Sequence, residues 1–460
     1  MEEGISDLVL ILKVTVSIRR PRIQFKSNEC ERFNSNQPSF QLSGMKQSPD
    51  KLSILYSTPA YKPAYEYGGP IAVVESIATR LVARGHRVAV YTTDFGLQEH
   101  PEIPRNAPQL VDGVEVRYFE RKNIMQGLFR RMSYFSKSMG YFFAPRLGNV
   151  VRHTIGDFDV VHTHMPYVYP THAVARMGLK AQRPLFYHQH GVFDPARLRF
   201  RNLKKKLSIN LFDRRIMRQA AMLFALTEAE RRSYRSLGVE APCRVIPNGI
   251  DTDVYLQHPN TGCEPLSGIP SDHIVILYLS RLHPIKGADI LFESFLRIAR
   301  QFRRATLVIA GPDEWGLEST FRQRVAATGL NGQVKVAGLV TGRQKLELLA
   351  RADLFCLPSL AEGFSVAVLE ALASATPVMI TPGCNFPEVE LHGAGWVVER
   401  DAEKWATALA EVIADPESLA VAGHAGLQLV RRNYTWDRIV DQIESTYIEV
   451  LDRRKRLAHT

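Results

Sequence analysis

An alternation of short apolar runs with amphipathic segments, present twice along the chain, constrains the fold more than any other feature. The runs 51–59 and 86–93 are apolar enough for strands that are buried on both faces. Between them, 71–85 has apolar residues three and four positions apart, which predicts a helix. A strand, a helix and a second strand form a β-α-β unit, so the sequence predicts an α/β fold with parallel sheets.

The repetition of this plan predicts two domains. In the first half, further strands are predicted at 114–119, 159–164, 184–190, 222–227 and 244–249. In the second half, the prediction is a helix at 287–302 and strands at 273–280, 305–311, 334–338, 354–359 and 377–381. We therefore expect two doubly wound, Rossmann-like domains whose sheets face each other across a ligand cleft.

The composition along the chain predicts the domain boundaries. Residues 1–50 are largely polar and aperiodic after an initial apolar run, so we expect a poorly ordered leader there. The first domain is predicted at 51–248 and the second at 273–433, joined by the Pro-, Gly- and Asn-rich linker 249–272. The remaining residues, 434–460, are predicted to form an amphipathic helix that crosses back to the first domain.

The overall composition is that of a soluble globular protein, with 45% hydrophobic and 23% charged residues in a chain of 460. No run of about eighteen uncharged apolar residues is present, which argues against a membrane-spanning helix. The five cysteines are dispersed without CxxC spacing. This pattern fits a reducing cytoplasm and gives little support to a disulfide framework or a structural zinc site.

The positive charge is concentrated in one segment, 117–218, whose net charge exceeds the +11 of the whole chain. Aromatic residues are interleaved with these charges: Phe129, Tyr134, Phe135, Tyr141, Phe142 and Phe143. Such a segment is either a solvated basic face or a surface for anionic lipid headgroups or an anionic, lipid-linked substrate. We expect contact with an anionic membrane surface, and no nucleic-acid partner, because no DNA- or RNA-reading motif accompanies the charge.

Two cations follow the first predicted strand of the second domain. Arg281 and Lys286 in SRLHPIKG therefore lie at the carboxyl end of that strand, where a planar fork and a flexible ammonium together suit a diphosphate. The alternative is a pair of solvated surface cations. No GxxxxGK[ST] loop is present, which disfavours nucleotide hydrolysis of the Walker type.

Two glutamates, Glu362 and Glu370, stand eight positions apart in PSLAEGFSVAVLEALASATP. A turn followed by a helix separates them by about 12 Å, which suits the two ends of an extended ligand better than a carboxylate pair acting on one bond. Between them, Gly363 permits close backbone approach, and the free N–H groups around Ser365 and Val366 favour an anion. Hydroxyls at each end and phosphates in the middle describe a nucleotide-sugar.

With RLHPIKG, IPNGID and YGGP elsewhere in the chain, this Glu-x7-Glu pattern resembles the retaining nucleotide-sugar glycosyltransferases of family 4, which have the GT-B fold. The resemblance extends over roughly 51–453. It implies that the first domain binds the acceptor and the second binds the nucleotide-sugar.

The resemblance also implies roles for single residues. Glu362 resembles the acid that holds sugar hydroxyls, Glu370 the one that binds the ribose, and Arg281 and Lys286 the cations that stabilise the departing diphosphate. His190 resembles the histidine that lines the sugar pocket. The resemblance further places Gly68 and Gly69 where a first-domain loop approaches the phosphates or the acceptor, and Asn248 and Gly249 at the interdomain turn. Asn385, in a loop that departs from the family pattern, is expected to supply an amide to the donor.

Several other patterns are predicted to be structural. His162 and His164 fall on one face of a strand, as metal ligands do, but no third ligand is evident in the sequence. Asp251 and Asp253 fit a turn or a helix cap better than a metal-binding DxD. Cys356 and Cys384 are expected to be core residues.

The sequence thus predicts a cytoplasmic, peripheral membrane enzyme that needs no metal or cofactor beyond its co-substrate. It would transfer a sugar, with retention, to a lipid-linked or polysaccharide acceptor in cell-envelope or exopolysaccharide synthesis. The alternatives are a phosphorylase or sugar-phosphate-forming enzyme on the same fold, or a noncatalytic sugar-nucleotide sensor. The sequence predicts neither the sugar, the base nor the oligomeric state.

Overall fold

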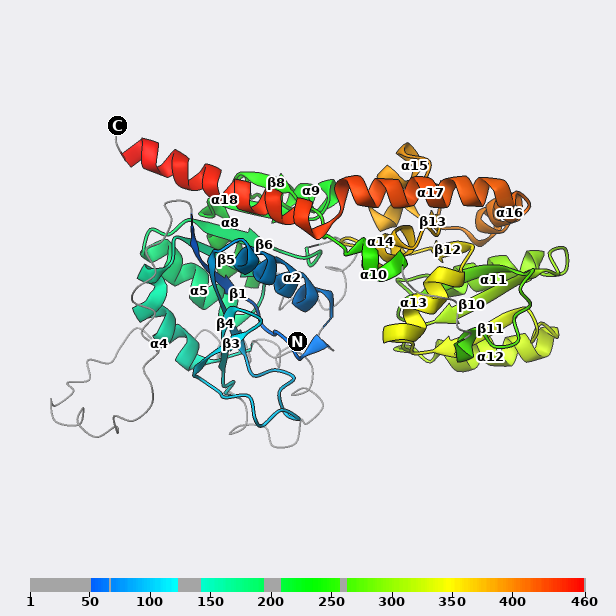
Figure 1. The fold of residues 1–460 in the computed structure, drawn as a ribbon, viewed down its shortest axis with the longest axis horizontal. Helices are drawn as coiled ribbons and strands as arrows, with labels where there is room; N and C mark the ends of the chain where they lie inside the picture. Colours follow the sequence, from blue (N-terminus) through cyan, green and yellow to red (C-terminus); the bar gives the residue numbers. More distant parts are fainter. Residues whose placement is uncertain (1–50, 66–67, 123–141, 194–207, 257–262, 459–460) are drawn as a thin grey trace.

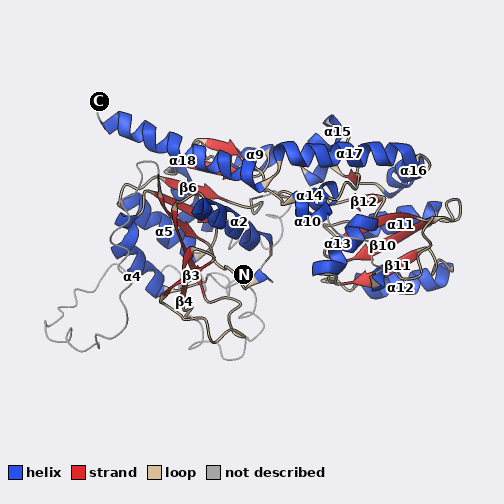
Figure 2. Cartoon of the chain, viewed as in Figure 1, coloured by secondary structure: helices blue, strands red, loops and turns tan. Residues whose placement is uncertain are grey.

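The computed structural model describes residues 51–65, 68–122, 142–193, 208–256 and 263–458 (Figure 1). The predicted leader 1–50 and four of the interleaved aromatic residues, from Phe129 to Tyr141, lie outside these ranges. The described residues form two separate sheets, each with helices packed around it (Figure 2).

The first sheet has eight strands in the order β3-β4-β2-β1-β5-β6-β7-β8. Its strands are β1 Ser53–Ser57, β2 Arg87–Thr93, β3 Pro108–Val111, β4 Val114–Phe119, β5 Val160–His164, β6 Leu185–His188, β7 Met222–Ala225 and β8 Cys243–Val245. All neighbours are parallel except β3 and β4. The alternation in the sequence therefore produced the predicted sheet, with one antiparallel edge.

Side chains of this sheet alternate between two apolar clusters because successive strand residues point to opposite faces. Ile54 and Tyr56 of β1 join the cluster under α2 (Gly69–Ala83), and Leu55 joins the cluster on the other face. The described part of this domain has four further α-helices: α4 Pro145–Thr154, α5 Tyr169–Lys180, α8 Arg214–Arg218 and α9 Glu228–Ser236. Burial on both faces explains why the strands read as near-continuous apolar runs.

The second sheet has six parallel strands in the order β11-β10-β9-β12-β13-β14. Its strands are β9 Ile274–Leu279, β10 Ala305–Ala310, β11 Val334–Gly338, β12 Leu354–Leu357, β13 Val378–Ile380 and β14 Gly395–Val397. Its helices are α11 Ala288–Ile298, α12 Leu317–Thr328, α13 Gly342–Arg351, α14 Val366–Ala373, α15 Glu388–Leu391, α16 Ala402–Ile413 and α17 Pro416–Asn433. The predicted second domain has this alternating plan.

Two strands were not predicted. β3 pairs with β4 through Asp112 and Gly113, both with positive φ, and adds one antiparallel strand to the edge of the predicted parallel sheet. Asp-Gly between apolar residues is a strong hairpin signal, because a type I′ turn needs left-handed residues at both central positions. β14 spans only three residues, too few to show a period.

The C-terminal segment joins the two halves. α17 lies along the second domain and α18 (Trp436–Ala458) along the first, where it packs against α2 (Figure 1). Trp436, Ile439 and Tyr447 of α18 are buried in the cluster under α2. A Cβ on Gly249 would lie 2.6 Å from ring atoms of Trp436, so the linker turn and the crossing helix fit only with glycine there.

The exact domain boundaries, 51–248, 249–272 and 273–433, remain predictions from the sequence. Among the helices of the described residues, none combines the length and apolarity needed to cross a membrane.

Candidate active site

A buried ion pair lies at the carboxyl edge of the second sheet. Lys286 lies in the loop after β9, and Glu362 lies in the loop after the neighbouring strand β12. Because these two strands are parallel, both loops lie at the same edge of the sheet. Lys286 Nζ lies 2.6 and 2.8 Å from the two carboxylate oxygens of Glu362. Their side chains are only 12% and 5% exposed. Two charges removed from water are tolerated because each neutralises the other.

The turn that carries Glu362 is held by the loop after β13. The Glu362 N–H donates to the Gly383 carbonyl at 2.8 Å, and Asn385 Nδ2 donates to the Glu362 carbonyl at 2.7 Å. The predicted amide is therefore present, but in this structure it binds the turn itself. Asn385 fixes the backbone that presents the carboxylate.

α14 begins directly after this turn. Ser365 is its N-cap and accepts a hydrogen bond from the Val368 N–H at 3.4 Å. Val366 is the first residue of the helix, where backbone N–H groups have no acceptor within the helix. The partial positive charge of these groups favours an anion beside Glu362.

Glu370 lies one turn from the end of α14 and is 8% exposed. One of its oxygens, Oε1, accepts hydrogen bonds from Tyr255 Oη at 2.8 Å and from Lys345 Nζ at 2.7 Å. Tyr255 belongs to the short helix α10 (Thr252–Leu256) in the predicted linker, and Lys345 to α13. The sequence did not single out either donor.

Arg281 follows β9, as predicted, but it forms a separate ion pair. Its Nη1 lies 2.9 and 2.7 Å from the two oxygens of Glu314, and both side chains are about half exposed. The structure thus brings Lys286 and Glu362 together and places Arg281 at the same sheet edge with another partner.

The two domains touch beside Glu362. A Cβ on either Gly191 or Gly363 would lie 2.7 Å from the Cα of the other, so the two backbones are in direct contact. Thr227 also donates to the Gly363 carbonyl at 3.4 Å. In this structure Gly363 therefore permits close approach of the first domain, where the sequence predicted close approach of a ligand.

His190 precedes Gly191, and its imidazole stacks on His164 and His188 of the first domain. Its backbone φ is 55°, a conformation that residues other than glycine rarely adopt. Its Nε2 lies 2.9 Å from His164 Nδ1, and burial lowers the pKa of His190 to about 3. At neutral pH the ring is uncharged, so it can offer a hydrogen bond but no charge.

Gly68 and Gly69 form the start of α2 in the first domain. Gly68 has a φ of 107°, which only glycine adopts without strain, and it is the N-cap of the helix. A Cβ on Gly69 would meet no atom within 4 Å. Among the residues that the structure describes, no atom fills the space beside Gly69.

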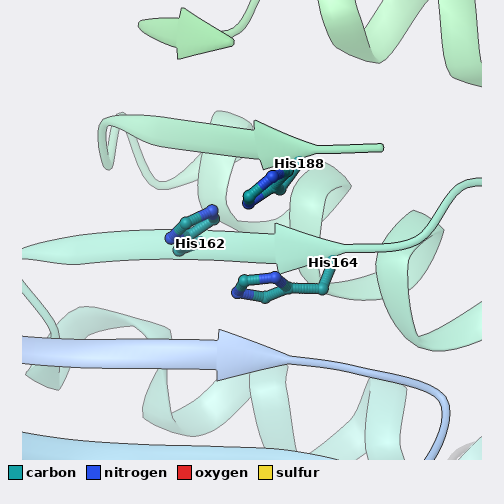
Figure 3. A group of neighbouring side chains, drawn as sticks. All are labelled: His162, His164 and His188. Atoms are coloured by element: carbon teal, nitrogen blue, oxygen red, sulfur yellow. The ribbon is translucent and has the colours of Figure 1, made fainter. Parts of the chain in front are cut away.

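A group of three buried histidines corrects one prediction. His162 and His164 do have a third imidazole beside them, His188 of β6 (Figure 3). The His162 and His164 rings stack, with centroids 4.2 Å apart and planes 27° apart. In-plane lone pairs of stacked rings run in separate planes, so this pair does not converge on one point as a metal site requires. Burial, followed by the neighbouring imidazoles, lowers the pKa of all three.

Asp251, Cys356 and Cys384 were also predicted to have structural roles. Asp251 pairs with Arg80 of α2. Cys356 and Cys384 are buried free thiols, and burial raises the pKa of both.

Two family descriptions match the chain, one in each half. Residues 67–254 match Glycosyltransferase Family 4, and residues 265–428 match Glycosyl transferases group 1. The chain belongs to the family 4 glycosyltransferases.

Curated relatives of this glycosyltransferase include the D-inositol 3-phosphate glycosyltransferases of Geodermatophilus obscurus and Mycolicibacterium smegmatis. The first is 27% identical over 413 residues, which cover 85% of this chain and 87% of the relative. The second is 25% identical over 426 residues, covering 89% and 94% of the two chains.

Solved structures confirm the predicted GT-B fold of this glycosyltransferase. Anabaena HepE in complex with UDP and glucose superposes with a TM-score of 0.64 at 22% identity, covering 86% of this chain and all of that one. WaaG, a glycosyltransferase involved in lipopolysaccharide biosynthesis, has a TM-score of 0.60 at 17% identity, covering 86% and 99%.

Proposed function

We propose that this glycosyltransferase transfers a sugar from a nucleoside diphosphate sugar to an acceptor hydroxyl, with retention and without a catalytic metal. The observation that carries the proposal is the Lys286–Glu362 pair at 2.6 and 2.8 Å, buried where the two domains touch. A carboxylate accepts hydrogen bonds from sugar hydroxyls, and an adjacent ammonium neutralises a phosphate. HepE, a structural neighbour, was solved with UDP-glucose.

In the proposed reaction the bond between the sugar and the diphosphate breaks, and negative charge grows on the leaving phosphate. Lys286 and the N–H groups at the start of α14 would stabilise that charge. Arg281 would join them after leaving Glu314, from which a half-exposed arginine separates at little cost. A single donor of this kind contributes about 10²- to 10³-fold to kcat.

Retention would follow from attack on the same face from which the diphosphate departs, with the leaving phosphate accepting the proton of the acceptor hydroxyl. Glu362 is already paired with Lys286, so it is poorly suited to act as a covalent nucleophile. Neutral His190 would donate or accept a hydrogen bond at the sugar. Closure of the two domains around the donor would exclude water and limit hydrolysis.

The acceptor is proposed to be anionic: a lipid-linked or polysaccharide substrate of cell-envelope or exopolysaccharide synthesis. The excess of Lys and Arg in 117–218 supports an anionic partner, and the enzyme would work in the cytoplasm, at the inner face of the membrane. A second candidate is a phosphorylated inositol, because the curated relatives are D-inositol 3-phosphate glycosyltransferases.

A donor and acceptor screen tests the proposal. UDP-, GDP- and ADP-sugars are incubated with short-chain polyprenyl phosphate sugars, oligosaccharides or inositol phosphate, and nucleotide release is measured. We expect release from one class of donor that rises when one acceptor is added. Sugar phosphate formed only with inorganic phosphate would identify a phosphorylase, and tight binding without turnover would identify a sensor.

A further inference from the structure

The hydrogen bonds to Glu370 are arranged asymmetrically. Tyr255 Oη and Lys345 Nζ both bind Oε1, at 2.8 and 2.7 Å. The other oxygen, Oε2, accepts no hydrogen bond from any residue that the structure describes. Both donors come from other elements: Tyr255 from α10 in the linker and Lys345 from α13 after β11.

Two donors on one oxygen fix the plane of the carboxylate. The terminal torsion of a glutamate side chain is otherwise broad, so an unpaired carboxylate would sample many orientations. Lys345 also compensates the charge of Glu370, whose side chain, taken without its backbone, is 11% exposed. Tyr255 adds a donor on a rigid, half-buried ring.

We propose that Tyr255 and Lys345 are positioning residues that hold Glu370 by Oε1 and thereby direct Oε2 to a ribose hydroxyl of the donor nucleotide. The inference rests on the proposed function and on the ribose-binding role that the resemblance implies for Glu370. Neither residue needs to touch the nucleotide. Their contribution is preorganisation: they order the carboxylate before the nucleotide binds, so that less conformational entropy is lost on binding.

The position of Tyr255 connects this support to the joint between the domains. α10 packs against both α13 and α14. Four residues before Tyr255, Asp251 pairs with Arg80 of α2 in the first domain. Ile250 donates to the Tyr434 carbonyl, beside the start of α18. The segment that crosses between the domains therefore also orients the carboxylate predicted to hold the ribose.

The test compares nucleotide binding by three variants of the full-length protein. Tyr255→Phe removes only the hydroxyl, and Lys345→Met keeps most of the side-chain length. Lys335→Met is the matched control, because Lys335 lies in the same domain and contacts the Ser267 carbonyl instead of Glu370. Calorimetry measures the Kd of UDP, GDP and ADP and of their 2′-deoxy and 3′-deoxy forms, after circular dichroism has shown that each variant is folded.

We expect wild type and Lys335→Met to lose roughly tenfold in affinity when one ribose hydroxyl is missing. Tyr255→Phe and Lys345→Met should each bind the ribonucleotide roughly three- to tenfold more weakly than wild type does. In these two variants, the affinities for the ribonucleotide and for its deoxy form should differ by less than about threefold. The base that is preferred should not change.

Variants that keep both the affinity and the ribose discrimination of wild type would overturn the inference while leaving the proposed function intact. A Lys345→Met variant with altered base preference but normal ribose discrimination would place Lys345 at the base and refute its positioning role. A wild type that binds no nucleoside diphosphate would refute the proposed function itself, and the inference with it.

Discussion

Breaking the Lys286–Glu362 pair from one side should destabilise the second domain more than breaking it from both sides. In Lys286→Met, the Glu362 carboxylate, whose side chain is 5% exposed, loses the ammonium group beside it. Removal of one member of a buried pair costs about 3 kcal/mol, the low end of the usual range, because this pair retains slight contact with solvent. For a domain of this size, that corresponds to a fall in Tm of roughly 6–12 °C.

The double variant Lys286→Met/Glu362→Gln removes both charges and should recover most of this loss. We expect a residual cost of about 1 kcal/mol in the double variant, less than the cost of either single variant, so the two effects should be far from additive. Differential scanning calorimetry at pH 7 on the wild type, both single variants and the double variant completes the cycle.

The matched control is the Arg231–Glu228 pair on α9. It has the same short separation, 2.7 Å, but its side chains are 38% and 54% exposed. Arg231→Met should cost less than about 1 kcal/mol, because solvent screens that pair. If Lys286→Met is as mild as the control, or if the effects of the two single variants simply add, the pair is not a buried coupled unit and the reasoning is wrong.

Three further predictions concern the fold, its pH dependence and the basic surface. Gly287→Ala should destabilise the protein by about 3 kcal/mol or more, because a Cβ there would lie 2.1 Å from the Pro358 carbonyl oxygen. The control Gly316→Ala has the same φ of 75° but meets no atom within 4 Å, so it should cost about 1 kcal/mol. Equal shifts in Tm for the two variants would contradict this. Burial lowers the pKa of His190 and of the three buried histidines His162, His164 and His188. Stability should therefore be fully present above about pH 6.5 and fall below it, because the unfolded chain takes up protons that the folded chain excludes. Chemical unfolding that is unchanged between pH 7 and 5 would refute this. Binding to vesicles of anionic lipid should weaken as the salt concentration rises. It should also weaken in the double variant Arg146→Glu/Arg152→Glu, which reverses two charges on α4. Binding that is unchanged by both salt and the double variant would argue against an electrostatic surface.

The sequence predicted those parts of the fold that follow from local periodicity. Twelve predicted strands are present because buried parallel strands are continuous apolar runs that separate clearly from amphipathic helices. β14 was missed because three residues show no period, and β3 because the Asp112-Gly113 turn signal was overlooked.

The sequence could predict those site residues that directly follow a predicted strand. Lys286 and Glu362 follow strands that the sequence located, and neighbouring parallel strands end at one edge. Which charges pair was not predictable. Arg281 binds Glu314, and Glu370 is held by Tyr255, which is 115 residues away in the sequence. Such pairings depend on side-chain packing between distant elements and leave no local pattern. His188 was missed as the third imidazole for the same reason.

Nucleotide release by Glu362→Gln tests the central proposal most directly. With the donor and acceptor found in the screen, wild type should release nucleotide in an acceptor-dependent manner. The variant should retain its fold, by circular dichroism, and lose roughly 10²-fold or more in kcat, because an amide replaces the carboxylate that would hold the sugar. Acceptor-dependent release at the wild-type rate would contradict the assignment of Glu362, and with it the site proposed for this glycosyltransferase.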